Sequence, residues 1–142
     1  MPRIILILTL FALVSCTGQN NQKGREEILS LSQTYVSALQ NQEIATLLSL
    51  WAEEGVYRNP LTGKLIRGKS RIKNEYLSLF KAVKEAKITV NIHAVSFPFP
   101  DKAIVEGEIA LEDSKPLDLS ILFLKQGEIW RILNVSEINF IE

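Results

Sequence analysis

The sequence predicts an α+β fold in which three N-terminal helices cover one face of a curved antiparallel sheet. Apolar residues recur at helical spacing in the first half of the chain, as in Ile44, Leu47, Leu48 and Trp51. After Lys87 the period changes to two residues and stays so to the end. The later segments have short connections, which favour neighbouring antiparallel strands. Helices first and strands afterwards is the order of a segregated α+β domain.

Length and composition allow one globular domain. The chain has 142 residues, of which 46% are hydrophobic and 23% charged, which is enough for one core and too little for a second domain. The formal net charge is zero and no basic stripe is present, so we expect no nucleic-acid partner.

Residues 1–15 have the pattern of an export signal. Arg3 precedes an apolar run from Ile4 to Val14, which is too short to span a membrane and typical of a signal peptide. The run ends in LVSC, which resembles the lipobox of bacterial lipoproteins, where the cysteine is acylated and the preceding peptide is removed. Cys16 is the only cysteine, and lipidation explains a lone thiol in an exported protein better than a plain secretory signal does.

This resemblance implies a protein that is anchored in the bacterial envelope by its lipid. Several acyl chains on Cys16 would hold the domain at a bilayer essentially permanently. Thr17 stands where an Asp often marks retention at the inner membrane, so we expect the outer membrane, with the domain facing the periplasm. Residues 16–24 are mostly small or polar, and we interpret them as a flexible tether to a domain at 25–142.

Three amphipathic helices are expected from residue 25 onward. The first carries apolar residues at helical spacing up to Leu39, and the second follows a tight turn and ends near Gly55. The third begins near Ser70 and has one apolar face, made of Ile72, Tyr76, Leu79 and Phe80.

A short hairpin separates the second and third helices. We expect strands at 56–60 and 64–68 with a turn at 61–63. The segment GKLIRGKS, residues 63–70, also matches the phosphate-loop pattern G-x-x-x-x-G-K-[ST]. A phosphate loop follows a buried parallel strand, whereas KLIR consists of strand formers rather than small loop residues. We therefore interpret the match as a hairpin and expect no nucleotide.

Four long strands complete the domain. They are expected at 87–97, 102–111, 116–125 and 128–140, and the turn sequences PFPD, EDSK and QGE join them. In the third of these strands, Leu119, Ile121 and Phe123 lie on one side, and the other side also contains leucines. Both faces of this strand are therefore substantially apolar.

The order of elements, and above all the segment from Tyr35 to Phe80, resembles the nuclear transport factor 2-like superfamily. This is a cone-shaped α+β fold that includes SnoaL-like polyketide cyclases and ketosteroid isomerases. A helix ending in YVSAL, a second helix ending in Trp and acidic residues, and RNP followed by two glycines carry the resemblance, which covers roughly residues 25–140. It implies a strongly curved sheet with a pocket at the open end of the cone.

The same resemblance implies positions for site residues. In the steroid isomerases an Asp directly before a Pro is the base, assisted by a Tyr late in the first helix and a protonated Asp on a later strand. Tyr35 matches that tyrosine, Asn59 stands at the base position, and the later acid falls near Ser120. Because an Asn side chain does not accept a proton at ordinary pH, isomerase activity by that mechanism is disfavoured.

Four residues are candidates for a ligand pocket, and none is given a catalytic role: Tyr35, Asn59, His93 and Ser120. Tyr35 is either a donor into the pocket or a core aromatic, and Asn59 either orients a ligand or caps its turn. His93, the only histidine, either joins them in a weak acid–base site or faces solvent. One His, one lipid-bearing Cys and no spaced carboxylate cluster predict neither a metal site nor a cofactor.

The sheet faces suggest a homodimer. The resemblance places the Ser120 side of its strand toward the pocket, which leaves Ile121 on the outer face. An outer face with Ile121, Phe123 and Leu133 needs a cover, and a second copy of the domain is the usual cover in this superfamily.

Three functions remain open at this stage. The first is a lipid-anchored protein that binds a small apolar ligand or an envelope partner without a catalytic set. The second is a SnoaL-like enzyme, an isomerase, cyclase or hydratase, with a pocket around Asn59, Tyr35 and His93. The third is an adaptor whose pocket is filled by side chains such as Trp51 and Trp130. Binder and adaptor rank above the enzyme, because the sequence brings no two titratable groups together.

Overall fold

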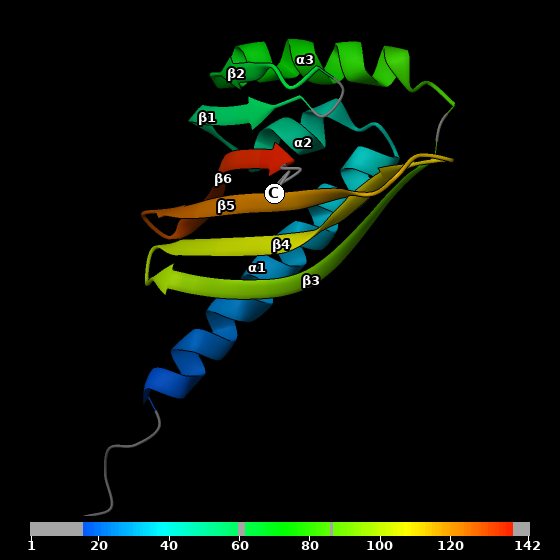
Figure 1. Cartoon of the computed structure of the whole chain (residues 1–142). Coiled ribbons are helices and arrows are strands. Elements are labelled where there is room, and N and C mark those ends of the chain that lie inside the picture. The colour runs from blue at the N-terminus through cyan, green and yellow to red at the C-terminus, as the bar shows by residue number, and fades with distance from the viewer. Residues whose placement is uncertain (1–15, 60–61, 86, 138–142) are drawn as a thin grey trace, which may run out of the picture.

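The computed structural model describes residues 16–59, 62–85 and 87–137, and in these ranges three helices pack on a curved sheet of six strands (Figure 1). The predicted fold class is confirmed. The elements are α1 (Cys16–Gln40), α2 (Ile44–Leu50), β1 (Trp51–Arg58), β2 (Leu65–Arg67), α3 (Lys69–Ala82), β3 (Ile88–Phe99), β4 (Lys102–Leu111), β5 (Leu117–Gln126) and β6 (Ile129–Glu137).

The sheet joins the two halves of the chain. Its strand order is β2-β1-β6-β5-β4-β3, and β3 to β6 form the predicted antiparallel meander. β1 pairs antiparallel with β2, as the hairpin interpretation of GKLIRGKS requires, and parallel with β6, with Tyr57 opposite Val135. The hairpin therefore extends the meander, a pairing that the sequence pattern did not indicate. Gly63 and Gly68 have φ angles of 69° and 92° at the two ends of β2, where a residue without Cβ is favoured.

The second helix is shorter than predicted, and the expected end near Gly55 is wrong. α2 stops at Leu50, and Trp51 is already the first residue of β1. The register against β6 shifts between Trp51 and Val56, which marks a bulge in β1. A Cβ at Gly55 would overlap Cε3 of the Trp51 indole, so this glycine makes room for the ring and does not terminate a helix.

The first helix is longer than predicted. Its backbone is helical from Cys16, so residues 16–24 form the first turns of α1 and not the expected flexible tether. The end of this segment and the residue after it pack on the sheet: Gly24 faces the ring of Phe97, and Arg25 Nη1 donates a hydrogen bond of 3.1 Å to the Val95 carbonyl. Within the described ranges, no helix is long and apolar enough to cross a membrane.

The core lies between the helices and one face of the sheet, and this corrects the predicted orientation of β5. Ile121 and Phe123 are fully buried in the core, whereas Ser120 is half-buried on the opposite, outer face. Ser120 pairs with Glu106 on β4, and this polar side faces outward because burying unpaired carboxylates is costly. Ile121 and Phe123 are therefore not available to a second copy, and Leu133 is half-buried, so the argument for a homodimer through these residues fails.

Candidate functional site

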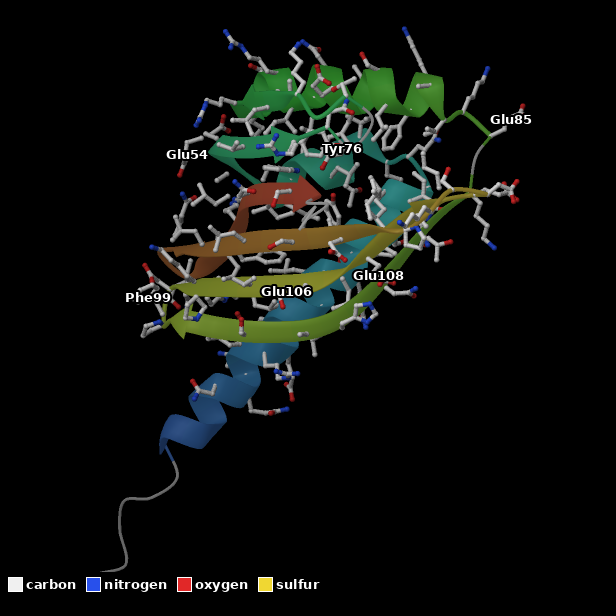
Figure 2. All side chains as sticks on the ribbon, viewed as in Figure 1. Glu54, Tyr76, Glu85, Phe99, Glu106 and Glu108 are labelled. Atoms are coloured by element: carbon white, nitrogen blue, oxygen red, sulfur yellow. The ribbon has the colours of Figure 1, made fainter. Side chains whose placement is uncertain are left out.

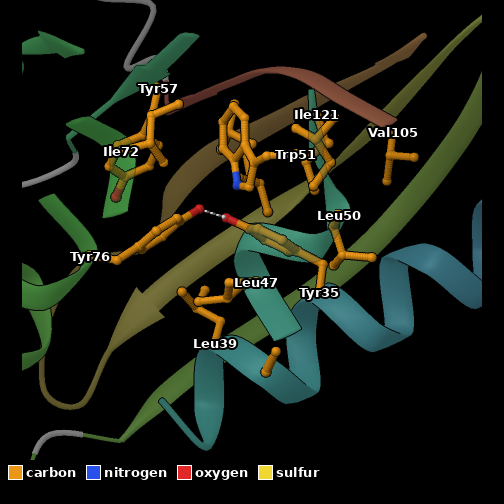
Figure 3. Packing of buried hydrophobic residues seen from close by; sticks show 14 of the residues in the cluster. Tyr35, Leu39, Leu47, Leu50, Trp51, Tyr57, Ile72, Tyr76, Val105 and Ile121 are labelled. Carbon is orange, nitrogen blue, oxygen red and sulfur yellow. Dashed lines mark hydrogen bonds between the residues drawn. The ribbon is translucent and has the colours of Figure 1, made fainter. Parts of the chain in front are cut away.

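Aromatic rings fill the space between α1, α3 and β1 (Figure 3). Trp51 makes edge contacts with Tyr57 and Tyr76, at centroid distances of 6.2 and 6.5 Å. The rings of Tyr57 and Tyr76 lie 5.0 Å apart, and Phe80 stacks on Tyr76 at 6.0 Å. Trp51 and Tyr57 are 1% exposed and Tyr76 0%. Such aromatic pairs contribute about 0.5–1.5 kcal/mol each beyond the burial of their area.

Three polar atoms meet inside this apolar interior. The hydroxyl of Tyr35, which is 1% exposed, lies 3.5 Å from the hydroxyl of Tyr76, and either can donate. In the described part of the chain, the buried Nε1 of Trp51 has no hydrogen-bond partner. Figure 3 shows the indole nitrogen and the two hydroxyls pointing toward one another. We call Tyr35, Trp51 and Tyr76 the Tyr–Trp cluster.

Within the Tyr–Trp cluster, the Nε1 donor of Trp51 has no acceptor among the described residues. Leaving a buried donor unpaired costs about 1–3 kcal/mol, and buried polar groups in native proteins are generally paired. An acceptor atom delivered to this place would remove that cost. The cluster is therefore a point in the described core at which a bound molecule would be held by a directed contact, and here, unlike at Trp130, two hydroxyls lie beside the unpaired N–H.

Each member of the cluster comes from a different element. Tyr35 lies late in α1, Trp51 opens β1 and Tyr76 is on the buried face of α3. Sequence reasoning found Tyr35 but treated Trp51 and Tyr76 as core residues only. The signal for Tyr76 was its hydroxyl on an otherwise apolar helix face, because a buried tyrosine normally finds a hydrogen-bond partner.

Asn59 lies at the end of β1 and is 5% exposed. Its Oδ1 accepts a hydrogen bond from the Thr62 backbone N–H at 3.2 Å, and its Nδ2 donates to Glu75 Oε2 at 3.0 Å. The first contact belongs to the turn-capping alternative, and the second links the hairpin to α3. Asn59 thus holds α3 and the β1–β2 hairpin together beside the Tyr–Trp cluster.

His93 and Ser120 lie on the outer face of the sheet, away from Tyr35. They share a shallow hollow of about 310 Å³, lined by His93, Ala94, Glu106, Gly107, Asp118, Leu119 and Ser120. His93 Nε2 is 3.6 Å from Glu108 Oε2, and the two side chains are 56% and 46% exposed. The register of β3 against β4 shifts between Ile92 and Ala94, so His93 stands at a bulge. The four predicted pocket residues therefore do not share one pocket.

Metal ligands do not gather in this molecule as far as the structure describes it. Over residues 16–59, 62–85 and 87–137, no group of three His, Cys, Asp or Glu side chains is arranged to hold a metal ion.

Comparison of the sequence with a known domain family identifies the family of this chain. The sequence profile of the SnoaL-like domain matches residues 32–132, which is most of the chain and includes all three residues of the Tyr–Trp cluster. The chain belongs to the SnoaL-like domain family. No curated protein matches it significantly in sequence.

Solved structures share the fold of this SnoaL-like domain. An uncharacterised protein with a cystatin-like fold from Caulobacter vibrioides has a TM-score of 0.70 at 17% identity, covering 83% of this chain and 92% of its own. An NTF2-like protein from Pseudomonas putida has a TM-score of 0.67 at 12% identity, with 84% and 91% covered. A candidate polyketide cyclase from Sinorhizobium meliloti has a TM-score of 0.56 at 19% identity, with 75% and 91% covered. At these identities the likeness shows the cone fold alone.

Proposed function

We propose that this SnoaL-like protein is anchored by lipid in the bacterial envelope and binds a small, largely apolar molecule at the Tyr–Trp cluster. The observation that supports binding is the Nε1 of Trp51, which is buried, has no partner among the described residues and points toward the hydroxyls of Tyr35 and Tyr76. A ligand oxygen at this place would accept the indole hydrogen bond.

The surroundings define the class of ligand. Aromatic and aliphatic side chains form the walls, among them Leu39, Leu47 and Tyr57, all at most 2% exposed. The cluster itself contains hydroxyls and an indole N–H and no charged group. We therefore expect an uncharged, flat or compact apolar molecule with a carbonyl, ether or hydroxyl oxygen.

Entry of such a ligand requires movement, since the cluster residues are at most 1% exposed. Polar contacts join α3 to the hairpin at two places. Glu75 accepts from Asn59 at 3.0 Å and lies 3.9 Å from Lys64 Nζ, and Lys69 Nζ lies 3.7 Å from Glu53 Oε1. Opening α3 away from the hairpin would have to break these contacts. We propose this seam as the entrance.

Anchoring in the envelope is supported by the sequence. The apolar run before LVSC and the single cysteine favour acylation at Cys16, and α1 begins at that residue. The outer membrane, with the domain facing the periplasm, remains the expected location. An enzyme built on Tyr35, Asn59 and His93 gains no support, because His93 lies on the outer face of the sheet.

Mass spectrometry of the protein purified from its own membranes tests both parts. The denatured chain should begin at an acylated Cys16, and the native protein should carry the added mass of a small molecule. Trp51→Phe should lose that mass. Trp130→Phe should keep it, and is a matched control because Trp130 Nε1 is also buried without a partner in the described part of the chain. A native wild type without added mass, or an ordered water as the acceptor of Trp51, would contradict ligand binding.

A further inference from the structure

Two hairpin tips at one end of the sheet carry the most exposed large apolar side chains of the described ranges. Phe99 on the β3–β4 tip is 58% exposed, and Ile129 on the β5–β6 tip is 55% exposed. The tips are neighbours, because the backbone N–H of Lys125 donates to the Asp101 carbonyl at 2.8 Å. Figure 2 shows Phe99 at this end of the sheet and Glu85 at the other. We call Phe99, Ile129, Lys102 and Lys125 the tip face.

The start of α1 lies at the same end (Figure 1). Asn21, Lys23, Gly24 and Glu27 of α1 form a hollow of about 430 Å³ with residues of the sheet, namely Phe97, Pro100, Lys125, Glu128 and Trp130. Cys16 precedes Asn21 by little more than one helical turn, about 7.5 Å along the axis. A lipid on Cys16 would therefore hold the membrane close to the tip face.

The charges of the tip face fit the boundary between water and lipid. Lys102 Nζ lies 5.1 Å from the centre of the Phe99 ring, and Lys125 Nζ lies 5.9 Å from that of Trp130. The methylene groups of a lysine can cover apolar surface while its ammonium group extends to the lipid phosphates at the membrane surface. Asp101 and Glu128 on the same tips balance these cations, so contact should not depend on anionic lipid.

The β4–β5 turn, at the opposite end of the sheet, is charged and not apolar. The β4–β5 turn carries Glu112, Asp113 and Lys115, all exposed. Such a turn has nothing to insert into lipid, because charged side chains are costly in hydrocarbon. Among the described hairpin residues, the two largest apolar exposures, at Phe99 and Ile129, thus lie at the end from which α1 starts, and Leu65 of the β1–β2 hairpin is less exposed at 43%.

We propose that the tip face rests on the bilayer that holds the lipidated Cys16, with Phe99 and Ile129 inserted at the level of the headgroups. This inference rests on the lipid anchoring proposed above. Trp130 is buried behind the tips, where its ring makes an edge contact with Phe97 at a centroid distance of 6.1 Å. Its indole supports the two hairpin tips from the protein side. The contact fixes the orientation of the domain, so that the Tyr–Trp cluster and the outer sheet face stand away from the lipid at defined heights.

Spin labels test this orientation. Phe99→Cys and Ile129→Cys in the full-length protein, labelled with a nitroxide and reconstituted in phosphatidylcholine vesicles, are compared with Leu77→Cys, whose parent side chain on α3 is 42% exposed. Accessibility to a water-soluble nickel chelate should be at least about threefold lower at 99 and 129 than at 77, and accessibility to oxygen should be higher. Equal accessibility at the three positions would overturn the proposal.

The same samples separate this inference from the proposed function. Intact mass shows whether Cys16 carries lipid, which decides the anchoring alone. The labels decide the tip face on chains whose intact mass shows an acylated Cys16, because a free Cys16 thiol would itself take the nitroxide. Equal accessibility on acylated chains overturns the tip face and leaves the anchoring standing. Protection of 99 and 129 in a Cys16→Ser chain kept in buffer without lipid or detergent would mean that a second copy or another protein covers the tips, and would overturn the membrane contact.

Discussion

The two tryptophans of the chain lie in different surroundings. Trp51 is 1% exposed and touches rings from β1 and α3, in the interior between helices and sheet. Trp130 is 6% exposed, makes an edge contact with Phe97 on β3 and lies under the Lys125 ammonium at the end of the sheet. Both indole nitrogens are buried without a partner in the described ranges. We expect the surroundings of Trp51 to be the more rigid of the two.

That difference should set how each region responds to change. The surroundings of Trp51 are formed by three elements that meet in one place, so no single neighbour can move without disturbing the others. The surroundings of Trp130 include a lysine stem and the first turns of α1, which can adjust. A glycine faces each region, Gly55 at Trp51 and Gly24 at Phe97. Replacing either glycine by alanine adds one methyl group and so tests how much space that region has.

The largest effect is expected for Gly55→Ala. The added Cβ would overlap the Trp51 ring, and the ring cannot retreat because Tyr57 and Tyr76 lie against it. We expect the free energy of unfolding to fall by about 2–3 kcal/mol, as for overpacking of a core. Urea unfolding followed by far-UV circular dichroism measures this.

A double-mutant cycle is the control for this prediction. In a Trp51→Phe background the smaller ring leaves space for the new methyl group, so the cost of Gly55→Ala should shrink by half or more, roughly 1 kcal/mol or above. An unchanged cost in both backgrounds would mean that the backbone of the β1 bulge, and not the indole, requires glycine.

An intermediate effect is expected when the tryptophans are exchanged for phenylalanine one at a time. Trp51→Phe should lower the free energy of unfolding of the ligand-free protein by about 1–2 kcal/mol, because lost packing outweighs the removal of an unpaired donor. Trp130→Phe should cost less than about 1 kcal/mol, because the neighbours at the sheet end can adjust. Equal losses in the same unfolding experiment would show that the two regions are equally rigid.

The sequence was sufficient to predict most elements of this fold. The strand at 102–111 matches β4 residue for residue, and the expected start of the third helix differs from α3 by one residue. These segments were predictable because a regular apolar period is a local property. The parallel pairing of β1 with β6 was not, because it joins residues such as Tyr57 and Val135 that are far apart in the chain.

The errors in the candidate site have a similar origin. Both sides of β5 carry apolar residues, so the strand alone did not determine which side faces the core. The deciding residues, Glu106 and Glu108, are on β4 opposite Ser120 and Asp118, and only the register brings them together. The bulge at His93 and the approach of Trp51 to Tyr76 likewise depend on pairing and packing that no local pattern contains.

The smallest effect, and one of opposite sign, is expected for Gly24→Ala in α1. A Cβ at this position would lie 3.7 Å from the Phe97 ring, an ordinary contact, and alanine favours the helix. The free energy of unfolding should rise by about 0.5–1 kcal/mol, which is a few degrees in Tm. Gly63→Ala is the control: nothing lies within 4 Å of a Cβ at this position, but its φ of 69° disfavours alanine, so stability should fall. A loss of stability in Gly24→Ala would mean that the contact between α1 and Phe97 has no room for a methyl group, and that the Trp130 region is as tightly packed as the Tyr–Trp cluster.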